Sequence, residues 1–240
     1  MIYGIIADIH ANLEALTVAV NALQERNVEK FICSGDIVGY GANPEECIDL
    51  LRSLDAKIVA GNHDWAAIYK VNINFFNAYA RDSAIWTSEN ISKKSKDFLE
   101  GLPLKISVDN FEVTHGTFDN AEEFNYIQSL DDADLSFSAL QAKLGFLSHS
   151  HIAMAFFKAN PTYYTLENKI QLKGDIPTII NTGSVGQPRD ENPRSSCAVY
   201  DTESGSVEIL RLEYDIAKTA DKIIKAGLPE INALRLFEGR

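Results

Sequence analysis

The first 60 residues alternate between short apolar runs and amphipathic segments, a pattern that predicts strands and helices in turn. Each amphipathic segment follows a helix-start signal, which is Asn12 in the first and Asn43 followed by Pro44 in the second. The predicted strands are Ile2–Ala7, Lys30–Cys33 and Ile58–Ala60, and the predicted helices run from Leu13 to Leu23 and from Pro44 to about Leu54. This alternation predicts a largely parallel sheet with right-handed crossovers.

The pattern changes in the rest of the chain, where short strands dominate. Two helices, Phe75–Ile91 and Lys93–Leu102, come first, and two more, Ile216–Ala226 and Pro229–Phe237, close the chain. The predicted strands between them are Lys105–Val108, Phe111–Thr114, Phe146–Ser148, Ala155–Phe157, Ile170–Lys173, Thr178–Asn181, Ser196–Tyr200 and Ser206–Leu212. No linker, repeat or low-complexity segment interrupts this series, so we expect one domain over residues 1–240. We expect an α/β fold with two sheets, one fed by each half of the chain, and helices flanking them.

Composition and charge narrow the class of protein. The 240 residues are 45% hydrophobic and 23% charged, which is ordinary for a folded chain. The formal net charge is −12 without a long basic run, so no nucleic-acid surface is evident. Three widely spaced cysteines, Cys33, Cys47 and Cys197, are typical of a reducing compartment. The start has no basic leader, and no stretch approaches the roughly 20 apolar residues of a membrane helix. We therefore expect a soluble cytoplasmic protein; the sequence does not indicate its oligomeric state.

Polar clusters follow the predicted strands and contain all five histidines. Open α/β sheets bind ligands at the carboxyl ends of their strands, so we expect the clusters to converge. Their oxygen and nitrogen donors, without thiolate, suit manganese, iron, zinc or cobalt better than copper(I) or calcium. The set is too large for one transition metal and about right for two. The clusters are Asp8-Ile9-His10, Gly35-Asp36, Gly61-Asn62-His63-Asp64, His115-Gly116 and His149-Ser150-His151.

These five motifs, in this order, resemble the calcineurin-like metallophosphoesterase superfamily. The resemblance implies a four-layer α/β/β/α sandwich of two mixed sheets flanked by helices. It also implies two divalent metals that share Asp36, with a hydroxide between them attacking phosphorus in line. His63 would hydrogen-bond the phosphoryl group or protonate the leaving oxygen, and Asp64 would orient it. The implied ligands are Asp8, His10, Asp36 and His151 for the first metal, and Asp36, Asn62, His115 and His149 for the second.

Several departures bear on the branch of this superfamily. Ser148 stands where a glycine usually precedes the first histidine of the last motif, a loss that matters only if the position needs a positive φ. The arginine that protein phosphatases and symmetrical dinucleoside tetraphosphatases carry after Gly35-Asp36 is absent, and Asp64 replaces their usual Glu. Residues 181–189 resemble a segment of the small bacterial and archaeal phosphodiesterase-like members. Within it, Arg189 could contact the substrate phosphate or form a surface ion pair.

The sequence thus predicts a dinuclear metal-dependent phosphoesterase that acts on phosphodiester bonds of a small phosphorylated substrate. Manganese is the favoured metal, with iron, zinc, cobalt or nickel as alternatives. The alternative functions are a phosphomonoesterase, a dinucleoside polyphosphate hydrolase, or a non-catalytic scaffold with this fold. Phe75 and Phe76 could line a groove, although packing in the core is the favoured interpretation. The roles of residues 117–128 and 183–189 stay open.

Overall fold

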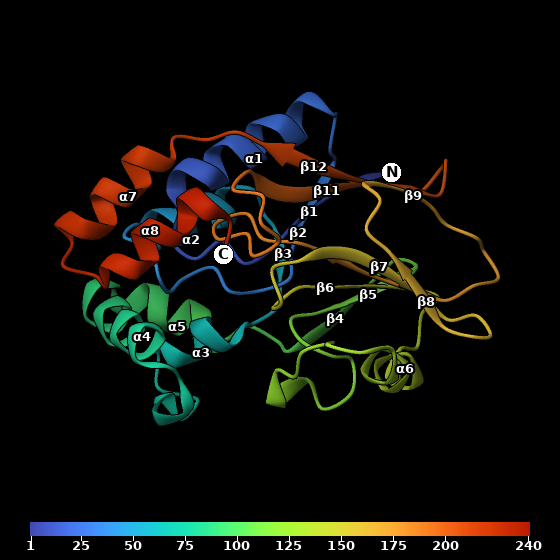
Figure 1. Cartoon of the computed structure of the whole chain (residues 1–240), viewed down its shortest axis with the longest axis horizontal. Coiled ribbons are helices and arrows are strands. Elements are labelled where there is room, and N and C mark those ends of the chain that lie inside the picture. Colours follow the sequence, from blue (N-terminus) through green and yellow to red (C-terminus); the bar gives the residue numbers. More distant parts are fainter.

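Two six-stranded mixed sheets form the centre of the computed structural model, which describes residues 1–240 (Figure 1). The first sheet has the order β3-β2-β1-β11-β12-β9, and the second has the order β4-β5-β6-β10-β7-β8. The strands of the first sheet are β1 (Ile2–Ile6), β2 (Lys30–Cys33), β3 (Lys57–Ile58), β9 (Lys169–Gln171), β11 (Ser195–Asp201) and β12 (Ser206–Leu212). Those of the second are β4 (Lys105–Val108), β5 (Phe111–Thr114), β6 (Leu144–Leu147), β7 (Ala153–Phe157), β8 (Tyr163–Thr165) and β10 (Thr178–Thr182).

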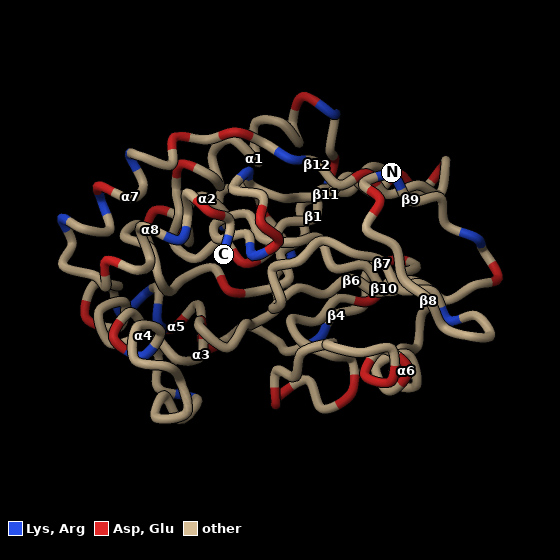
Figure 2. Tube along the Cα trace, in the orientation of Figure 1, with Lys and Arg blue, Asp and Glu red and all other residues tan.

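Helices cover the outer faces of both sheets (Figure 1). The α-helices are α1 (Leu13–Glu25), α2 (Pro44–Ser53), α3 (Asn62–Ala66), α4 (Ala78–Asn90), α5 (Lys93–Glu100), α6 (Leu130–Ala139), α7 (Ile216–Lys225) and α8 (Glu230–Glu238). Two short 3-10 helices, η1 (Ile73–Phe75) and η2 (Ala121–Glu123), lie in the connections. Acidic and basic residues are interspersed along the helices and loops (Figure 2). No helix is long and apolar enough to cross a membrane.

The apolar residues form layers that follow this arrangement. Ile5 and Ile32 of the first sheet belong to the same buried cluster as Phe111, Phe146 and Ile180 of the second, so the two sheets pack face to face. A larger cluster joins the first sheet to α1 and α2, and a smaller one lies between the second sheet and α6. The expected architecture, two mixed sheets flanked by helices, is confirmed.

The expectation that each half of the chain feeds its own sheet is wrong. Strands β9, β11 and β12 belong to the second half, yet they complete the first sheet. β1 pairs parallel with β2 on one edge and antiparallel with β11 on the other, with Gly4 opposite Val199. β1, buried from Tyr3 to Ile6, needs a partner on both edges, because unpaired backbone groups are costly away from water. An apolar run predicts a strand but not the sheet that receives it.

The predicted helix Phe75–Ile91 begins later than expected. Asn77 caps α4 with its side-chain oxygen, which accepts from the backbone N–H of Ala80 at 2.9 Å. Phe75 therefore lies before the helix, in η1, with 88% of its surface exposed. The core position favoured for this residue is wrong.

Candidate metal centre

Polar side chains from the loops after five strands meet at one place. The strands are β1, β2, β3, β5 and β6, and except for the half-buried Asn62 the side chains that meet are buried, with at most 6% of their surface exposed. Their ligating atoms form two groups, each within 4.8 Å. The first group is Asp8, His10, Asp36 and His151, and the second is Asp36, His115 and His149.

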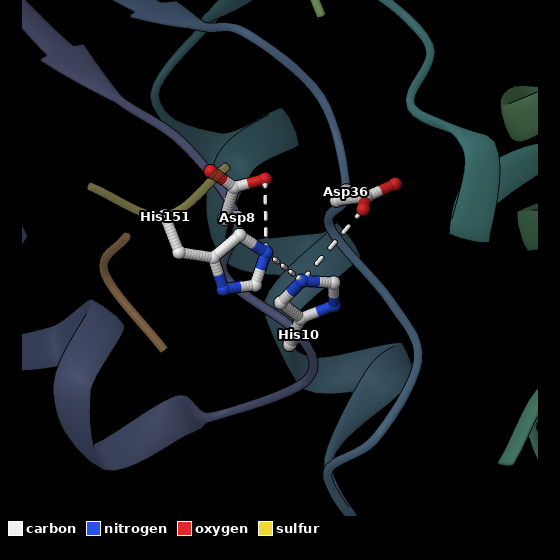
Figure 3. Close-up of side chains that lie close together, drawn as sticks. All are labelled: Asp8, His10, Asp36 and His151. Atoms are coloured by element: carbon white, nitrogen blue, oxygen red, sulfur yellow. Dashed lines mark hydrogen bonds and ion pairs between the residues drawn. The ribbon is translucent and has the colours of Figure 1, made fainter. Parts of the chain in front are cut away.

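The first group has four electron-rich atoms that face one another (Figure 3). The Nε2 atoms of His10 and His151 are 3.1 Å apart. Asp36 Oδ2 lies 3.6 Å from His10 Nε2, and Asp8 Oδ1 lies 3.6 Å from His151 Nε2. Without a cation, this crowding of ligand atoms is unfavourable.

The protonation of the two rings follows from their other nitrogens. Nδ1 of His10 lies 3.1 Å from the Val38 carbonyl oxygen, and Nδ1 of His151 lies 2.6 Å from that of Gln187. A carbonyl oxygen only accepts, so each Nδ1 carries the proton and donates it. Each Nε2 is then unprotonated, and its lone pair faces the other ligand atoms of the group. Metal-ligating histidines show the same arrangement.

The second group is built in the same way around His115. Its Nδ1 donates to the Ser34 carbonyl at 2.8 Å, which leaves the Nε2 lone pair facing the group. That Nε2 lies 3.1 Å from His149 Nδ1, 3.2 Å from Asn62 Oδ1 and 3.4 Å from Asp36 Oδ2. Asp36 is thus shared by both groups, and its position between them fits two metal ions rather than one.

Burial sets the ionisation of four of these groups. It raises the pKa of the Asp8 carboxyl to about 8 and lowers the pKa of His10, His149 and His151 well below the usual value. The three imidazoles are therefore neutral and able to coordinate, while Asp8 needs a positive partner to remain a carboxylate near pH 7. The donor set of the chain fits a pair of divalent ions.

Five of the proposed ligands have a backbone in the left-handed region. Their φ angles run from 48° at Asp8 to 71° at His149, with His10, Asp36 and His151 between them. This region is uncommon for residues with a Cβ and costs about 1–3 kcal/mol at each position. Backbone hydrogen bonds between the loops hold it, including Asp8 N to Gly35 O and His10 N to Asp36 O, each 3.0 Å long.

Asp64 does not orient His63, contrary to the expectation from the motif. Its carboxylate accepts four backbone N–H groups, from Asp36 and Gly61 at 2.9 Å, from Ile37 at 2.9 Å and from Val38 at 3.2 Å. It therefore fastens the start of α3 to the loop that carries Asp36. The motif gave no indication of these long-range bonds.

The side chain of His63 makes no hydrogen bond through Nδ1, although that atom is buried. The ring lies between Tyr40 and Phe76, with centroid distances of 4.4 and 5.1 Å. Gly39, at φ 91°, approaches so closely that a Cβ there would lie 2.6 Å from His63 Nδ1. Burial lowers the pKa of His63 to about 4. The backbone N–H of His63 also donates to Asp36 Oδ1 at 2.8 Å, which links this loop to the shared ligand.

Ser148 stands where the family pattern has glycine, and its backbone is not strained there. It is not among the residues with positive φ, and its Oγ donates to the Ser34 carbonyl oxygen at 2.9 Å. The same carbonyl accepts from His115 Nδ1, so Ser148 reinforces a ligand's support. The departure from the pattern leaves the geometry intact.

The segment 183–189 forms hydrogen bonds that hold the backbone of Asp8, a member of the first group. Ser184 Oγ donates to the carbonyl oxygen of Asp8 at 2.7 Å, and Gly186 N donates to the same oxygen at 3.0 Å. A Cβ on Gly186 would lie 1.8 Å from the Ile9 carbonyl oxygen, so only glycine fits there. Arg189 forms no ion pair. Its Nη2 donates to Gln187 Oε1 at 2.8 Å and its guanidinium lies 5.8 Å from the centre of the Tyr40 ring.

A cavity of about 360 Å³ adjoins the centre and is lined by Asn62, His63 and His149. Its other walls come from Tyr40 and from residues within 71–80 and 122–126, and the aromatic side chains of those two segments that line it are Phe75, Phe76, Phe124 and Tyr126. Tyr126 stacks on His149 with a centroid distance of 3.8 Å and an interplanar angle of 17°. Part of the segment 117–128, whose role the sequence left open, is therefore a cavity wall.

Comparison with known proteins agrees with this geometry. The profile of the calcineurin-like phosphoesterase superfamily domain matches residues 1–205. An uncharacterized protein from Methanocaldococcus jannaschii is 40% identical over 245 residues, covering 99% of this chain and 98% of that protein. A crystal structure of a metallophosphoesterase from Sphaerobacter thermophilus has a TM-score of 0.89 at 34% identity, over 100% of this chain and 99% of that one. A hypothetical protein from Pyrococcus horikoshii OT3 has the same fold, with a TM-score of 0.81 at 19% identity, over 100% and 98% of the two chains.

Proposed function

The chain belongs to the calcineurin-like phosphoesterase superfamily, and from that premise we propose that it hydrolyses phosphodiesters at the paired Asp/His centre. The two ligand groups would hold one divalent ion each and share Asp36. The first ion takes Asp8, His10, Asp36 and His151, and the second takes Asp36, Asn62, His115 and His149. Two divalent ions supply Lewis acidity, generate the nucleophile from water and offset charge on the phosphoryl oxygens. Manganese is the metal we propose first, because the donors are oxygen and imidazole nitrogen.

The residues around the metals have separate tasks in this proposal. His63 borders the cavity and no ligand group includes its ring, so the ring is available to the phosphoryl group or the leaving oxygen. Asp64 keeps the loop of Asp36 in place through four backbone hydrogen bonds and acts as a positioning residue. Arg189, free of any ion pair and next to Tyr40, is available to a substrate oxygen.

The observation that favours a diester is the cavity beside the metals. Its charged residues are two acids, Glu122 and Glu123, and it contains no lysine or arginine. A phosphodiester carries one negative charge and places an uncharged ester group beside the metals. A phosphomonoester carries close to two charges near neutral pH and has only one ester group, so it gains less from such a cavity.

Hydrolysis of bis-p-nitrophenyl phosphate and p-nitrophenyl phosphate, measured with manganese, nickel, cobalt, zinc and magnesium, tests this proposal. We expect a higher kcat/KM for the diester in the presence of manganese, and no turnover after chelation of the metals. A higher kcat/KM for the monoester would replace the proposal by a phosphomonoesterase. Two bound ions without turnover of either compound would indicate a scaffold.

A further inference from the structure

The aromatic side chains of the cavity are unusual in their exposure. Phe75 is 88% exposed and Tyr126 is 41% exposed, although both line the cavity that adjoins the metal centre. An exposed phenyl ring forgoes the stabilisation that burial of apolar surface gives, so it has no role in holding the fold. Figure 1 shows the teal segment after α3, which holds Phe75, and the yellow-green segment between β5 and α6, which holds Tyr126, projecting on the same side of the molecule.

The rings lie beside residues proposed to act on the phosphoryl group or to bind a metal, so an ester group of the substrate would lie among them. Phe76 contacts His63 at a centroid distance of 5.1 Å, and Tyr126 stacks on the proposed ligand His149 at 3.8 Å. Phe124 is buried and lies edge-on to Trp65, with a centroid distance of 5.4 Å. Flat groups bind between such rings because aromatic faces and edges attract one another. The cavity of about 360 Å³ is large enough for a ring system beside the phosphoryl group.

The charge of the cavity mouth limits the group that can bind. Glu122 and Glu123 are exposed and lie on η2, and neither forms an ion pair. Two carboxylates without a cationic partner repel a second anionic group, such as a further phosphate or a carboxylate. The group that fits is therefore uncharged as well as flat.

We propose that this cavity is a subsite for a flat, uncharged aromatic group attached to one ester oxygen of the substrate. The proposal rests on the phosphodiesterase activity proposed above and names the class of diester that the centre prefers. It assigns the preference for a flat group to Phe75, with Phe76 and Tyr126 as further walls of the subsite and Glu122 and Glu123 excluding anionic groups.

Two non-hydrolysable probes, phenylphosphonate and cyclohexylphosphonate, test the subsite without any turnover. They share the phosphonate that the metals hold and differ in whether the six-membered ring is flat. Their dissociation constants are measured by calorimetric titration of the manganese-loaded protein. We expect phenylphosphonate to bind about 2- to 12-fold more tightly, the range that one aromatic pair provides.

Variants identify the residue that gives this preference. Phe75→Ala should abolish it, whereas Phe237→Ala should retain it, because Phe237 is a 53% exposed phenylalanine on α8 outside the cavity. A third probe, 4-carboxyphenylphosphonate, should bind more weakly than phenylphosphonate, and the double variant Glu122→Gln/Glu123→Gln should remove that penalty. Equal binding of the two rings, or a preference that survives Phe75→Ala, would overturn the subsite.

The outcomes separate the two proposals. A preference for phenylphosphonate without hydrolysis of bis-p-nitrophenyl phosphate would leave the subsite standing and overturn the activity. Hydrolysis of the diester without a phenyl preference would overturn the subsite alone. If neither phosphonate binds when two ions are present and the diester is not hydrolysed, both proposals are wrong.

Discussion

Replacement of His63 by alanine separates catalysis from metal binding. The side chain of His63 is not in either ligand group. It packs edge-on to the ring of His10 at a centroid distance of 5.0 Å, and its backbone N–H donates to Asp36 Oδ1 at 2.8 Å. Alanine keeps that N–H. We therefore expect His63→Ala to bind two metal ions as the unchanged protein does.

Turnover should fall because the ring that borders the phosphoryl position is removed. A positioned proton donor or acceptor contributes about 10²- to 10⁴-fold to the rate, which corresponds to roughly 2.7–5.4 kcal/mol of barrier. Nδ1 of His63 has no hydrogen-bond partner, so removing the ring breaks no hydrogen bond at that atom. We expect kcat for bis-p-nitrophenyl phosphate to fall by this factor.

Metal content is measured by inductively coupled plasma mass spectrometry and kcat by release of p-nitrophenolate. His151→Ala is the matched control, since it removes an equally buried histidine whose Nε2 faces the first group. This control should lose bound metal as well as activity. A metal-free His63→Ala protein, or one whose kcat stays within about threefold of the original, would refute the separation of roles.

Three further predictions follow from the site and its supports. Asp36→Ala should lose both metal ions, because both ligand groups use this carboxylate, whereas His151→Ala should retain one; metal-to-protein ratios by mass spectrometry check this. Asp64→Asn should lower the free energy of unfolding by about 2–4 kcal/mol in urea titrations, because a carboxylate that accepts four N–H groups becomes an amide with one acceptor, and a loss below 0.5 kcal/mol would contradict that account. Burial alone would raise the pKa of the Glu112 carboxyl, but hydrogen bonds from the N–H groups of Gln141 and Ala142 outweigh it, so the pKa is lowered. The stability this gives is present at neutral pH and lost as the pH falls through that lowered pKa. Glu112→Gln should cost about 1–3 kcal/mol at pH 7 and progressively less as the pH falls through that pKa, as urea titrations at successive pH values would show.

Local signals in the sequence were enough to predict the first strands and helices, and the resemblance to a known family assigned the ligands to two groups. Asp8, Asp36 and Asn62 each follow one of three parallel strands of the same sheet, and chain direction alone places such residues at the same edge. The histidines of the second half could be added because their motifs resemble those of a known family. Patterns of this kind depend on neighbours in the sequence.

Features that depend on distant neighbours escaped prediction. β11 could have joined either sheet, since its apolar pattern does not identify β1 as its partner. The Asp64 carboxylate accepts hydrogen bonds from backbone N–H groups 26 to 28 positions earlier in the sequence. The motif suggested an interaction only with its neighbour His63. Phe75 was expected in the core because it was predicted to lie within a covering helix, but α4 begins only after the cap at Asn77 and leaves Phe75 outside it.

The left-handed backbone at five proposed ligands has a consequence for variation in this chain. Glycine or asparagine adopts that conformation at lower cost, so replacing one of these residues can relieve strain while it removes a ligand. A laboratory search that selects only for heat resistance in metal-free medium would therefore drift toward sequences without the centre. At these five positions a substitution that raises stability lowers activity, so only selection for turnover retains the ligands.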